Sequence, residues 1–374
     1  MAGLEKLKLF SDAFRAVAEE RASDLFLKVG APPAMRVSGR VKPIGTAAVT
    51  EEMMEGLLEE IARPEARARF KERGDVDCAY EVFGVGRFRV NVFRQRGYVG
   101  MVFRFIRNRI PALEEMNLPG DVLKRIAEKP RGLILVTGTT GSGKSTTLAG
   151  MLNHINQTQE KHIVTVEDPV EYTFTDVKSV IDQRELGQDT ETFTSALKAV
   201  VRQAPDIIMI GEMRDSETVE AALHAAETGH LVFSTLHTIN AMQTIERILN
   251  FFPPHQHDFL KQQLAQLLVG VISMRLLRTK DGKSRVPTVE IMVDAPTVRD
   301  LLAQGKIREL YKAIKEGSYY GMQTFNQSLR GLIQADLISV EDALAAADSP
   351  DELRLEIRGI MKGSRAPGDM TFKV

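Results

Sequence analysis

One short segment has the residue types and the spacing that are needed to hold a chain of phosphates. Residues 138–145, GTTGSGKS, match the pattern G-x-x-x-x-G-K-[ST] at every position. Glycines let successive backbone N–H groups turn inward, and the N-terminus of a following helix adds its positive end to them. The pattern therefore predicts a phosphate-binding loop in which Lys144 reaches the β- and γ-phosphates and the Ser145 hydroxyl ligates Mg²⁺.

The sequence on both sides of this loop supports the prediction. The apolar run LILV precedes the loop as a strand would, and TTLAGMLNHI follows it as a helix would. A glycine-rich turn with a solvated lysine is the weaker alternative, because such a turn needs neither all eight positions nor both flanks. The predicted nucleotide-binding residues are Gly138, Thr139, Thr140, Gly141, Ser142, Gly143, Lys144, Ser145 and Thr146.

Carboxylates follow two other apolar runs. A nucleotide hydrolase needs a group that positions the attacking water, and Glu212 follows the strand-like run 207–210 where α/β sheets bind ligands. A glutamate in that place is commonly a plain loop residue, but the phosphate-binding loop makes Glu212 a candidate. Glu167 and Glu171 lie at and beyond the end of HIVTV. A turn or a helix cap is the alternative for this second cluster, since its Asp-Pro pair suits a turn.

Two histidines, His230 and His237, bracket the strand-like run LVFSTL. A single histidine at such a position is commonly a structural residue whose ring nitrogens are hydrogen-bonded. No metal-ligand spacing of the H-E-x-x-H kind accompanies either of them. They are therefore candidates only in combination with the phosphate-binding loop and Glu212.

The elements that must position these residues form two patterns. Over the first ~106 residues, helical spacing alternates with half-buried strand patterns, which predicts a small α+β domain. Residues 107–120 contain two prolines and break both periodicities, so they are the predicted linker. From residue 121 to 374, short Val-, Ile- and Leu-rich runs alternate with helices, as in a parallel sheet buried on both faces, and the chain is helical from about 297. The predicted fold class is α/β, with domains 1–106 and 121–374.

Composition narrows the classes of protein that fit. A chain of 374 residues with 43% hydrophobic and 26% charged residues should form two soluble domains. With 49 Lys and Arg against 50 Asp and Glu, there is no basic field for a nucleic acid. The single cysteine, Cys78, excludes an intramolecular disulfide and fits a reducing cytoplasm. No run approaches the ~20 apolar residues of a spanning helix, so any membrane contact is expected to be peripheral.

Taken together, the motifs resemble the secretion ATPase superfamily of pilus and type II secretion motors. Within it, the chain resembles the PilT-type twitching-motility ATPases, which include the PilU paralogues. Beside the phosphate-binding loop, the resemblance rests on VEDPVEY, QRELGQDTETF, RQAPDIIMIGEMRD and ETGHLVFSTLHT. It extends over nearly the whole chain, from SDLFLKVGAPPAMRVSGRV to GMQTFNQSL.

The resemblance implies a PAS-like N-terminal domain, a RecA-like ATPase domain and a ring of six chains. ATP would lie between the ATPase domain of one chain and the N-terminal domain of another. By the family's pattern, Glu212 is the catalytic glutamate of the Walker B motif, and Glu167 and Glu171 are Asp-box acids near the water and the metal. His230 and His237 are the His-box residues that respond to the γ-phosphate.

Two arginines of the N-terminal domain, Arg89 and Arg104, match the family's arginines in RFRVN and VFR. Charge that develops on the γ-phosphoryl group needs a cation, and an arginine finger from a neighbouring domain supplies one. An arginine in an alternating strand is otherwise usually part of its solvated face. The resemblance therefore makes Arg89 and Arg104 candidate fingers.

The function implied is that of a homohexameric ATPase motor that uses Mg-ATP to power type IV pilus disassembly and retraction. Such a motor is cytoplasmic and binds peripherally at the inner membrane. The expected partners are the inner-membrane pilus platform protein and a PilT or PilU paralogue, and no nucleic acid is expected.

Other functions fit part of the pattern. Pilus extension and type II secretion ATPases share these motifs, but they commonly carry a tetracysteine zinc insertion, which one cysteine cannot form. A RecA-like nucleic-acid translocase needs basic loops with stacking aromatic residues, whereas this chain is nearly neutral and has no tryptophan. A module that binds nucleotide without hydrolysis is disfavoured by Glu212. Residues 297–300, TVRD, stand where the commonest retraction motor has AIRN, so the choice of paralogue stays open.

Overall fold

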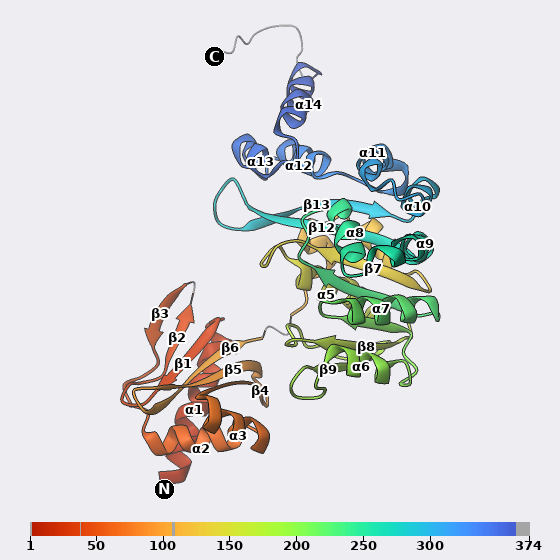
Figure 1. Cartoon of the computed structure of the whole chain (residues 1–374). Helices are drawn as coiled ribbons and strands as arrows, with labels where there is room; N and C mark the ends of the chain where they lie inside the picture. The colour runs from red at the N-terminus through yellow and green to blue at the C-terminus, as the bar shows by residue number, and fades with distance from the viewer. Residues whose placement is uncertain (1, 38, 107–108, 364–374) are drawn as a thin grey trace. The chain divides into compact units, whose positions relative to one another are not determined.

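The computed structural model describes residues 2–37, 39–106 and 109–363, and it divides into two compact units (Figure 1). Unit 1 comprises Met1–Arg109 and Pro169–Phe174, and unit 2 comprises Ile110–Asp168 and Thr175–Val374. The short segment Pro169–Phe174 is an excursion that the sequence places deep inside the second predicted domain. The predicted α/β class is confirmed, because both units combine sheets with helices.

Within the described residues, unit 1 holds a six-stranded antiparallel sheet in the order β3-β2-β1-β6-β5-β4. Its strands are β1 (Asp24–Lys28), β2 (Ala34–Val37), β3 (Arg40–Pro43), β4 (Asp75–Val82), β5 (Gly86–Gln95) and β6 (Tyr98–Phe105). Its helices are α1 (Ala2–Glu19), α2 (Glu51–Ile61) and α3 (Pro64–Arg73). Helix α2 begins directly after Thr50, whose hydroxyl accepts a hydrogen bond from the Met53 N–H at 3.3 Å and so caps the helix start.

One face of this sheet packs against the helices and forms the core of unit 1. Phe14 of α1 contacts Phe88 of β5 and Phe103 of β6, with ring centroids 5.0 and 5.1 Å apart. Phe88 and Val90 are buried while Arg89 between them is exposed, which is the alternation expected of a half-buried strand. The predicted arginines therefore lie on the face of the sheet that α1 does not cover.

Unit 2 is built on a seven-stranded sheet, in the part of the chain that the structure describes, with the order β13-β12-β7-β11-β10-β8-β9. Its strands are β7 (Gly132–Thr137), β8 (His162–Glu167), β9 (Val180–Glu185), β10 (Ile207–Ile210), β11 (Leu231–Leu236), β12 (Leu268–Arg278) and β13 (Arg285–Val293). All pairings are parallel except that of β12 with β13. Every residue of β7, β10 and β11 is buried, as the apolar runs predict.

Helices and short 3₁₀ turns connect these strands. They are η1 (Leu113–Met116), α4 (Gly120–Ala127), α5 (Lys144–Thr158), α6 (Phe193–Val200), α7 (Ser216–Glu227), α8 (Ala241–Asn250), η2 (Pro254–Gln256) and α9 (His257–Leu267). Part of the predicted linker is therefore structured, because Leu113 in η1 is buried and lies against Gly150 of α5. Residues 107–108 of that linker lie outside the described residues.

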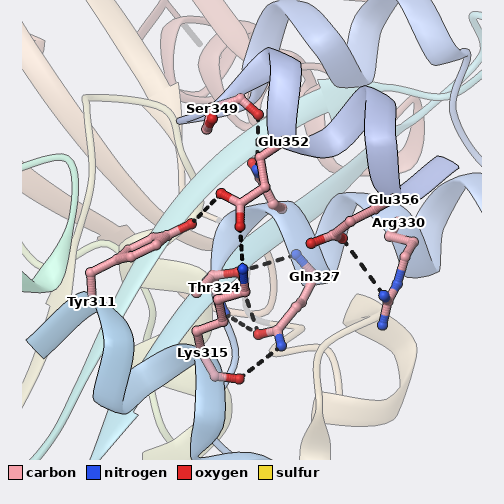
Figure 2. A network of polar contacts seen from close by, with 9 residues as sticks. Tyr311, Lys315, Thr324, Gln327, Arg330, Ser349, Glu352 and Glu356 are labelled. Atoms are coloured by element: carbon pink, nitrogen blue, oxygen red, sulfur yellow. Dashed lines mark hydrogen bonds and ion pairs between the residues drawn. The ribbon is translucent and has the colours of Figure 1, made fainter. Parts of the chain in front are cut away.

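The chain after β13 is helical, as predicted. It contains α10 (Pro296–Ala303), η3 (Ile307–Glu309), α11 (Leu310–Glu316), η4 (Ser318–Tyr320), α12 (Phe325–Gln334), α13 (Val340–Ala346) and α14 (Pro350–Gly363), which gather beyond β13 (Figure 1). Glu352 of α14 holds these helices together, since it accepts hydrogen bonds from Tyr311 and Lys315 of α11 (Figure 2). Arg330 of α12 pairs with Glu356 of α14 at 3.6 Å.

The same C-terminal region covers the outer edge of β13. The Val289 N–H donates to the Ser328 hydroxyl at 3.1 Å, and the Val289 carbonyl accepts from the Gln323 side chain at 3.1 Å. Ile291 forms an antiparallel bridge with Gln323. The outward hydrogen-bonding groups of Val289 and Ile291, in the middle of this edge strand, are therefore occupied within the chain. Across the described helices, none is both long enough and apolar enough for a membrane span.

Candidate nucleotide-binding site

The predicted phosphate-binding loop connects β7 to α5 at the C-terminal edge of the parallel sheet. Gly138, Gly141 and Gly143 have φ values of 142°, 80° and 102°, which favour glycine. At Gly138 there is also no room for a side chain, because a Cβ would lie 2.5 Å from the Met274 carbonyl oxygen and 2.6 Å from Ser142 Oγ. The glycines of the motif are therefore required by the path of the chain.

Polar groups of the loop lie where an anion could be held. Helix α5 begins at Lys144, so the first amides of the helix have no partners within it. The Lys144 side chain is buried, and its Nζ donates to the carbonyl oxygens of Gly138 at 2.7 Å and Thr139 at 3.1 Å. Ser142 Oγ is buried without a hydrogen-bond partner among the described residues. Amides at a helix start, an ammonium group and a hydroxyl are the groups that hold a phosphate chain.

Glu212 lies at the same edge of the sheet, two residues beyond the end of β10. Its neighbour Gly211 is fixed by a hydrogen bond from its N–H to the Val166 carbonyl at 2.8 Å and by another from Thr235 Oγ1 to its own carbonyl at 2.7 Å. The Glu212 side chain is 19% exposed. A largely buried carboxylate on a backbone held from both neighbouring strands has a well-defined position.

The two oxygens of Glu212 have different partners. Oε2 lies 3.0 Å from Arg214 Nη2, and Oε1 lies 3.1 Å from His237 Nε2. The hydrogen bond and the charge of Glu212 raise the pKa of the Arg214 guanidinium above its ordinary value, and Asp168, at 3.7 Å, adds to this. The carboxyl ends of β8, β10 and β11 thus bring together Asp168, Glu212, Arg214 and His237. A carboxylate held in this way can orient and accept a proton from a water molecule.

Arg214 was not among the candidates from the sequence, although it stands only two residues after Glu212 in GEMRD. A charged residue in a loop is usually solvated, and only the folded chain shows that its guanidinium reaches the catalytic candidate. Asp168 was likewise not nominated, since an Asp-Pro pair is typical of a turn. An acid and a base close to a candidate glutamate would have been the signal for both.

Glu167 is the last residue of β8, and its carboxylate is buried. Oε1 accepts hydrogen bonds from Thr165 Oγ1 at 2.7 Å and from Gln183 Nε2 of β9 at 3.1 Å. These contacts join β8 to β9, whereas the contacts of Glu212 run toward β11. Glu171 is exposed and belongs to the excursion Pro169–Phe174 in unit 1, so its relation to the loop stays a prediction.

The two predicted histidines lie at opposite edges of the sheet. His237 follows β11 and meets Glu212, whereas His230 precedes β11. The six residues of β11 separate them by roughly 20 Å at the usual rise of a strand. His230 Nδ1 lies 2.9 Å from the Ala225 carbonyl at the end of α7. The structure therefore places only His237 beside the nucleotide-binding loop.

Arg89 and Arg104 lie directly opposite each other on β5 and β6 in unit 1. The Arg104 side chain is 71% exposed, and its Nε donates to Asp24 Oδ1 at 3.1 Å. Arg36 Nε lies 3.2 Å from the other oxygen of Asp24, which is itself buried. The open face of this sheet thus gathers guanidinium groups around one carboxylate, and their role at the phosphate stays a prediction.

The donor set at the loop also fits a magnesium ion. No group of three or more His, Cys, Asp or Glu residues in the described part of the chain could hold a metal by itself. Mg²⁺ commonly takes only one or two protein oxygens and completes its shell with phosphate and water oxygens. The hydroxyl of Ser145, in the first turn of α5, is an oxygen donor of that kind.

Comparisons with known proteins agree with this geometry. The family described as type II/IV secretion system protein matches residues 101–336. The type IV pilus retraction ATPase PilT of Pseudomonas aeruginosa is 44% identical over 334 residues, which cover 89% of this chain and 96% of that protein. The type IV pilus ATPase PilU of the same organism is 42% identical over 349 residues, with coverage of 93% and 91%. A crystal structure of the pilus retraction motor PilT with bound ADP is similar with a TM-score of 0.84 and 43% identity, over 93% of this chain and 98% of that one.

Proposed function

Since this chain belongs to the type II/IV secretion system protein family, we propose that it is a hexameric ATPase motor that powers disassembly and retraction of type IV pili. The observation that carries the proposal is the 44% identity to the retraction ATPase PilT over 96% of that protein's length. The bound ADP in the structure of a similar PilT motor supports nucleotide binding by this chain. Its complete phosphate-binding loop supports the same conclusion.

In the proposed reaction, Lys144 and the amides of the loop bind the phosphates of ATP. Ser145 would hold a Mg²⁺ ion, whose charge offsets that of the phosphate oxygens. Glu212 orients the attacking water and accepts its proton. Each carboxylate oxygen can accept more than one hydrogen bond, so the water can bind Glu212 while Arg214 and His237 keep their contacts. Arg214 keeps hold of the second oxygen and so preserves the orientation of the carboxylate.

The remaining predicted residues have proposed roles by resemblance. Arg89 and Arg104 would approach the γ-phosphate of a neighbouring chain and offset the charge that develops in the transition state. Glu167 and Glu171 would act as Asp-box acids near the water and the metal. His230 would respond to the γ-phosphate from a neighbouring part of the ring, since within its own unit it lies at the opposite edge of the sheet.

The proposed setting is the cytoplasmic face of the inner membrane, with peripheral attachment through the pilus platform protein. A PilT or PilU paralogue is a second proposed partner, since this chain is similar to both proteins. The single cysteine supports a retraction motor over the zinc-bearing extension and secretion motors. The nearly neutral net charge supports a protein, rather than a nucleic acid, as the polymer on which the motor acts.

The test is made in cells that produce type IV pili. Deletion of the gene should leave cells with excess surface pili that no longer retract, and the unmodified gene should restore retraction while Lys144→Ala should not. Loss of surface pili on deletion would show an extension motor instead. Normal piliation and normal retraction would contradict any role as the principal motor.

A further inference from the structure

Glu290 of β13 is a buried carboxylate that has no place in the chemistry described so far; it is only 1% exposed. It lies directly opposite Ser273 of β12, and Ser273 lies opposite Thr137 of β7. Thr137 is the residue before the phosphate-binding loop, and its hydroxyl donates to Ser273 Oγ at 2.9 Å. A buried row of polar side chains, Glu290, Ser273 and Thr137, therefore crosses the sheet and ends at the residue before the phosphate-binding loop.

Glu290 contacts the beginning of α8. Its Oε1 accepts a hydrogen bond from the N–H of Ala241, the first residue of that helix, at 2.8 Å. Asn240 accepts a second one from the Gln243 N–H at 2.9 Å. The first amides of a helix lack partners within it and carry partial positive charge, so a carboxylate beside them stabilises the helix start. Since Ala241 is fully buried, water cannot take the place of Glu290.

The first turn of α8 in turn holds the segment that carries His237. Only three residues separate His237 from α8. Within them, the Thr238 and Thr244 hydroxyls lie 2.7 Å apart, and the Thr244 hydroxyl donates to the Asn240 carbonyl at 2.7 Å. The segment is thus anchored to β11 at one end and to the Glu290-bound helix start at the other, and Glu212 lies at its His237 end.

We propose that Glu290 is a positioning residue of the ATPase: by holding the first turn of α8 it places His237 against Glu212. The inference rests on the proposed role of the Glu212–His237 pair. A purely structural role would predict lower stability without any selective loss of turnover.

Steady-state ATP hydrolysis by the full-length hexamer tests this, with Glu290→Met and Glu290→Gln as the variants. Methionine fills the space but cannot accept the Ala241 hydrogen bond, so kcat should fall roughly ten- to a hundredfold while KM and ADP affinity stay unchanged. Glutamine keeps the accepting oxygen, so its kcat should stay within roughly threefold of the parent. Parental kcat for a folded Glu290→Met, or an equal loss for both variants, would overturn the inference.

Thr288→Val is the matched control. Thr288 lies two residues before Glu290 on β13, is equally buried, and its hydroxyl has no hydrogen-bond partner among the described residues. Valine has the same shape, so this variant should hydrolyse ATP at the parental rate. Hydrogen exchange of residues 237–245 should become faster in Glu290→Met and stay unchanged in Thr288→Val. Unchanged exchange in both would also contradict the positioning role.

A second variant keeps the test decisive if Glu290→Met fails to assemble. Ala241→Pro removes the donated N–H and puts a ring carbon in its place beside Glu290, so the contact is broken from the helix side; proline is otherwise tolerated at the first position of a helix after an extended residue such as Asn240. It should lower kcat as Glu290→Met does, and parental kcat would overturn the inference. His237→Ala separates the two proposals: if it leaves kcat unchanged, the site assignment fails, and if it lowers kcat while Ala241→Pro does not, only the positioning role fails.

Discussion

At the scale of the single residue, Glu212 is both fixed in orientation and able to accept a proton. One of its oxygens pairs with a permanently charged arginine, and the other contacts a histidine. The arginine fixes the direction of the carboxylate, and lone pairs that neither partner uses remain for a water molecule. A side chain that kept the shape but lost the basicity would therefore still bind these neighbours. It would not accept a proton.

Glu212→Gln is expected to bind ATP and ADP like the parent but to release phosphate roughly a hundredfold more slowly, because an amide cannot act as a general base. Phosphate release and nucleotide affinity, measured on the same preparation, check both parts. Glu220→Gln, the same change at an exposed position of α7, is the matched control and should keep the parental rate. Equal rates for the parent and Glu212→Gln would refute the catalytic assignment.

Glu290 makes stability depend on pH in a direction opposite to that of most carboxylates. The pKa of Glu290 is raised from 4.5 to about 7, chiefly by burial; the Ala241 N–H and the charge of Arg275 oppose this rise, and the charge of Asp348 adds to it. A raised pKa means that the contribution to folding is complete below the unfolded pKa and is lost as the pH rises through 7. Glu290→Gln, which cannot ionise, should therefore gain stability relative to the parent, by about 3 kcal/mol between pH 4.5 and 8.

Urea unfolding followed by far-UV circular dichroism at several pH values measures this difference, since the chain has no tryptophan. Glu352→Gln is the control, for which stability should change with pH in the opposite direction. The hydrogen bond from Lys315 lowers the pKa of Glu352 (Figure 2). The contribution of Glu352 to stability is therefore present above its ordinary pKa and is lost as the pH falls. A pH-independent difference between the parent and Glu290→Gln would contradict the raised pKa.

At the scale of the element, α5 is anchored at both ends. Its N-terminus receives the phosphate-binding loop, and Asn156 near its C-terminus holds the chain where it returns from the excursion Pro169–Phe174. Asn156 Nδ2 donates to the Thr175 carbonyl at 2.8 Å, and its Oδ1 accepts from the Val177 N–H at 3.0 Å. The helix thus fixes the return of the segment that contains Glu171.

Asn156→Ala should lower the free energy of unfolding by about 1–3 kcal/mol, because it removes the two hydrogen bonds that this buried side chain makes to the returning chain. Denaturant unfolding of the full chain measures the loss. Gln157→Ala, the next position of α5 and an exposed one, should change stability by less than about 0.5 kcal/mol. An equal effect of the two substitutions would show that Asn156 does not anchor the returning chain.

Elements with strong local patterns were predictable from the sequence, and those that depend on distant partners were not. The buried runs of β7, β10 and β11 and the Thr50 cap of α2 follow from local residue types. By contrast, α9 continues into β12 without a turn, and Pro287 argues against a strand in the stretch that forms β13. Proline is tolerated there because β13 is the edge strand of the sheet.

The same distinction applies to the site. Lys144, Glu212 and His237 could be nominated because each belongs to a motif or follows a strand at its carboxyl end. Arg214 and Glu290 could not, since a charged residue in a loop and a single glutamate in the apolar run VEIMV carry no local signal. Only the pairing of β12 with β13 and the start of α8 bring Glu290 to its partner.

At the scale of the whole molecule, the residues assigned to one reaction are divided between two units. The phosphate-binding loop, Glu212 and His237 belong to unit 2, while Arg89 and Arg104 belong to unit 1. In the proposed ring, a complete site takes these two sets from different chains. Activity should therefore depend on which chains are neighbours.

Mixed rings test this directly. Arg89→Ala and Lys144→Ala chains, each inactive alone, should regain part of the ATPase activity after mixing and reassembly, because a Lys144→Ala chain supplies Arg89 to an intact loop. Glu212→Gln mixed with Lys144→Ala is the matched control and should regain none, since both residues lie in the same unit. Absence of recovery for the first pair at every mixing ratio would contradict an arginine finger between chains.

The covered edge of β13 bears on how such rings can be built. A strand edge with free amides and carbonyls can recruit a strand from another copy and fuse two sheets into one. Here Gln323 and Ser328 occupy that edge, so neighbouring chains cannot extend the sheet on this side. Any contact that another copy made with the middle of this edge would therefore run through side chains. In the proposed ring, the sheet of each chain would therefore stay separate from those of its neighbours on this side.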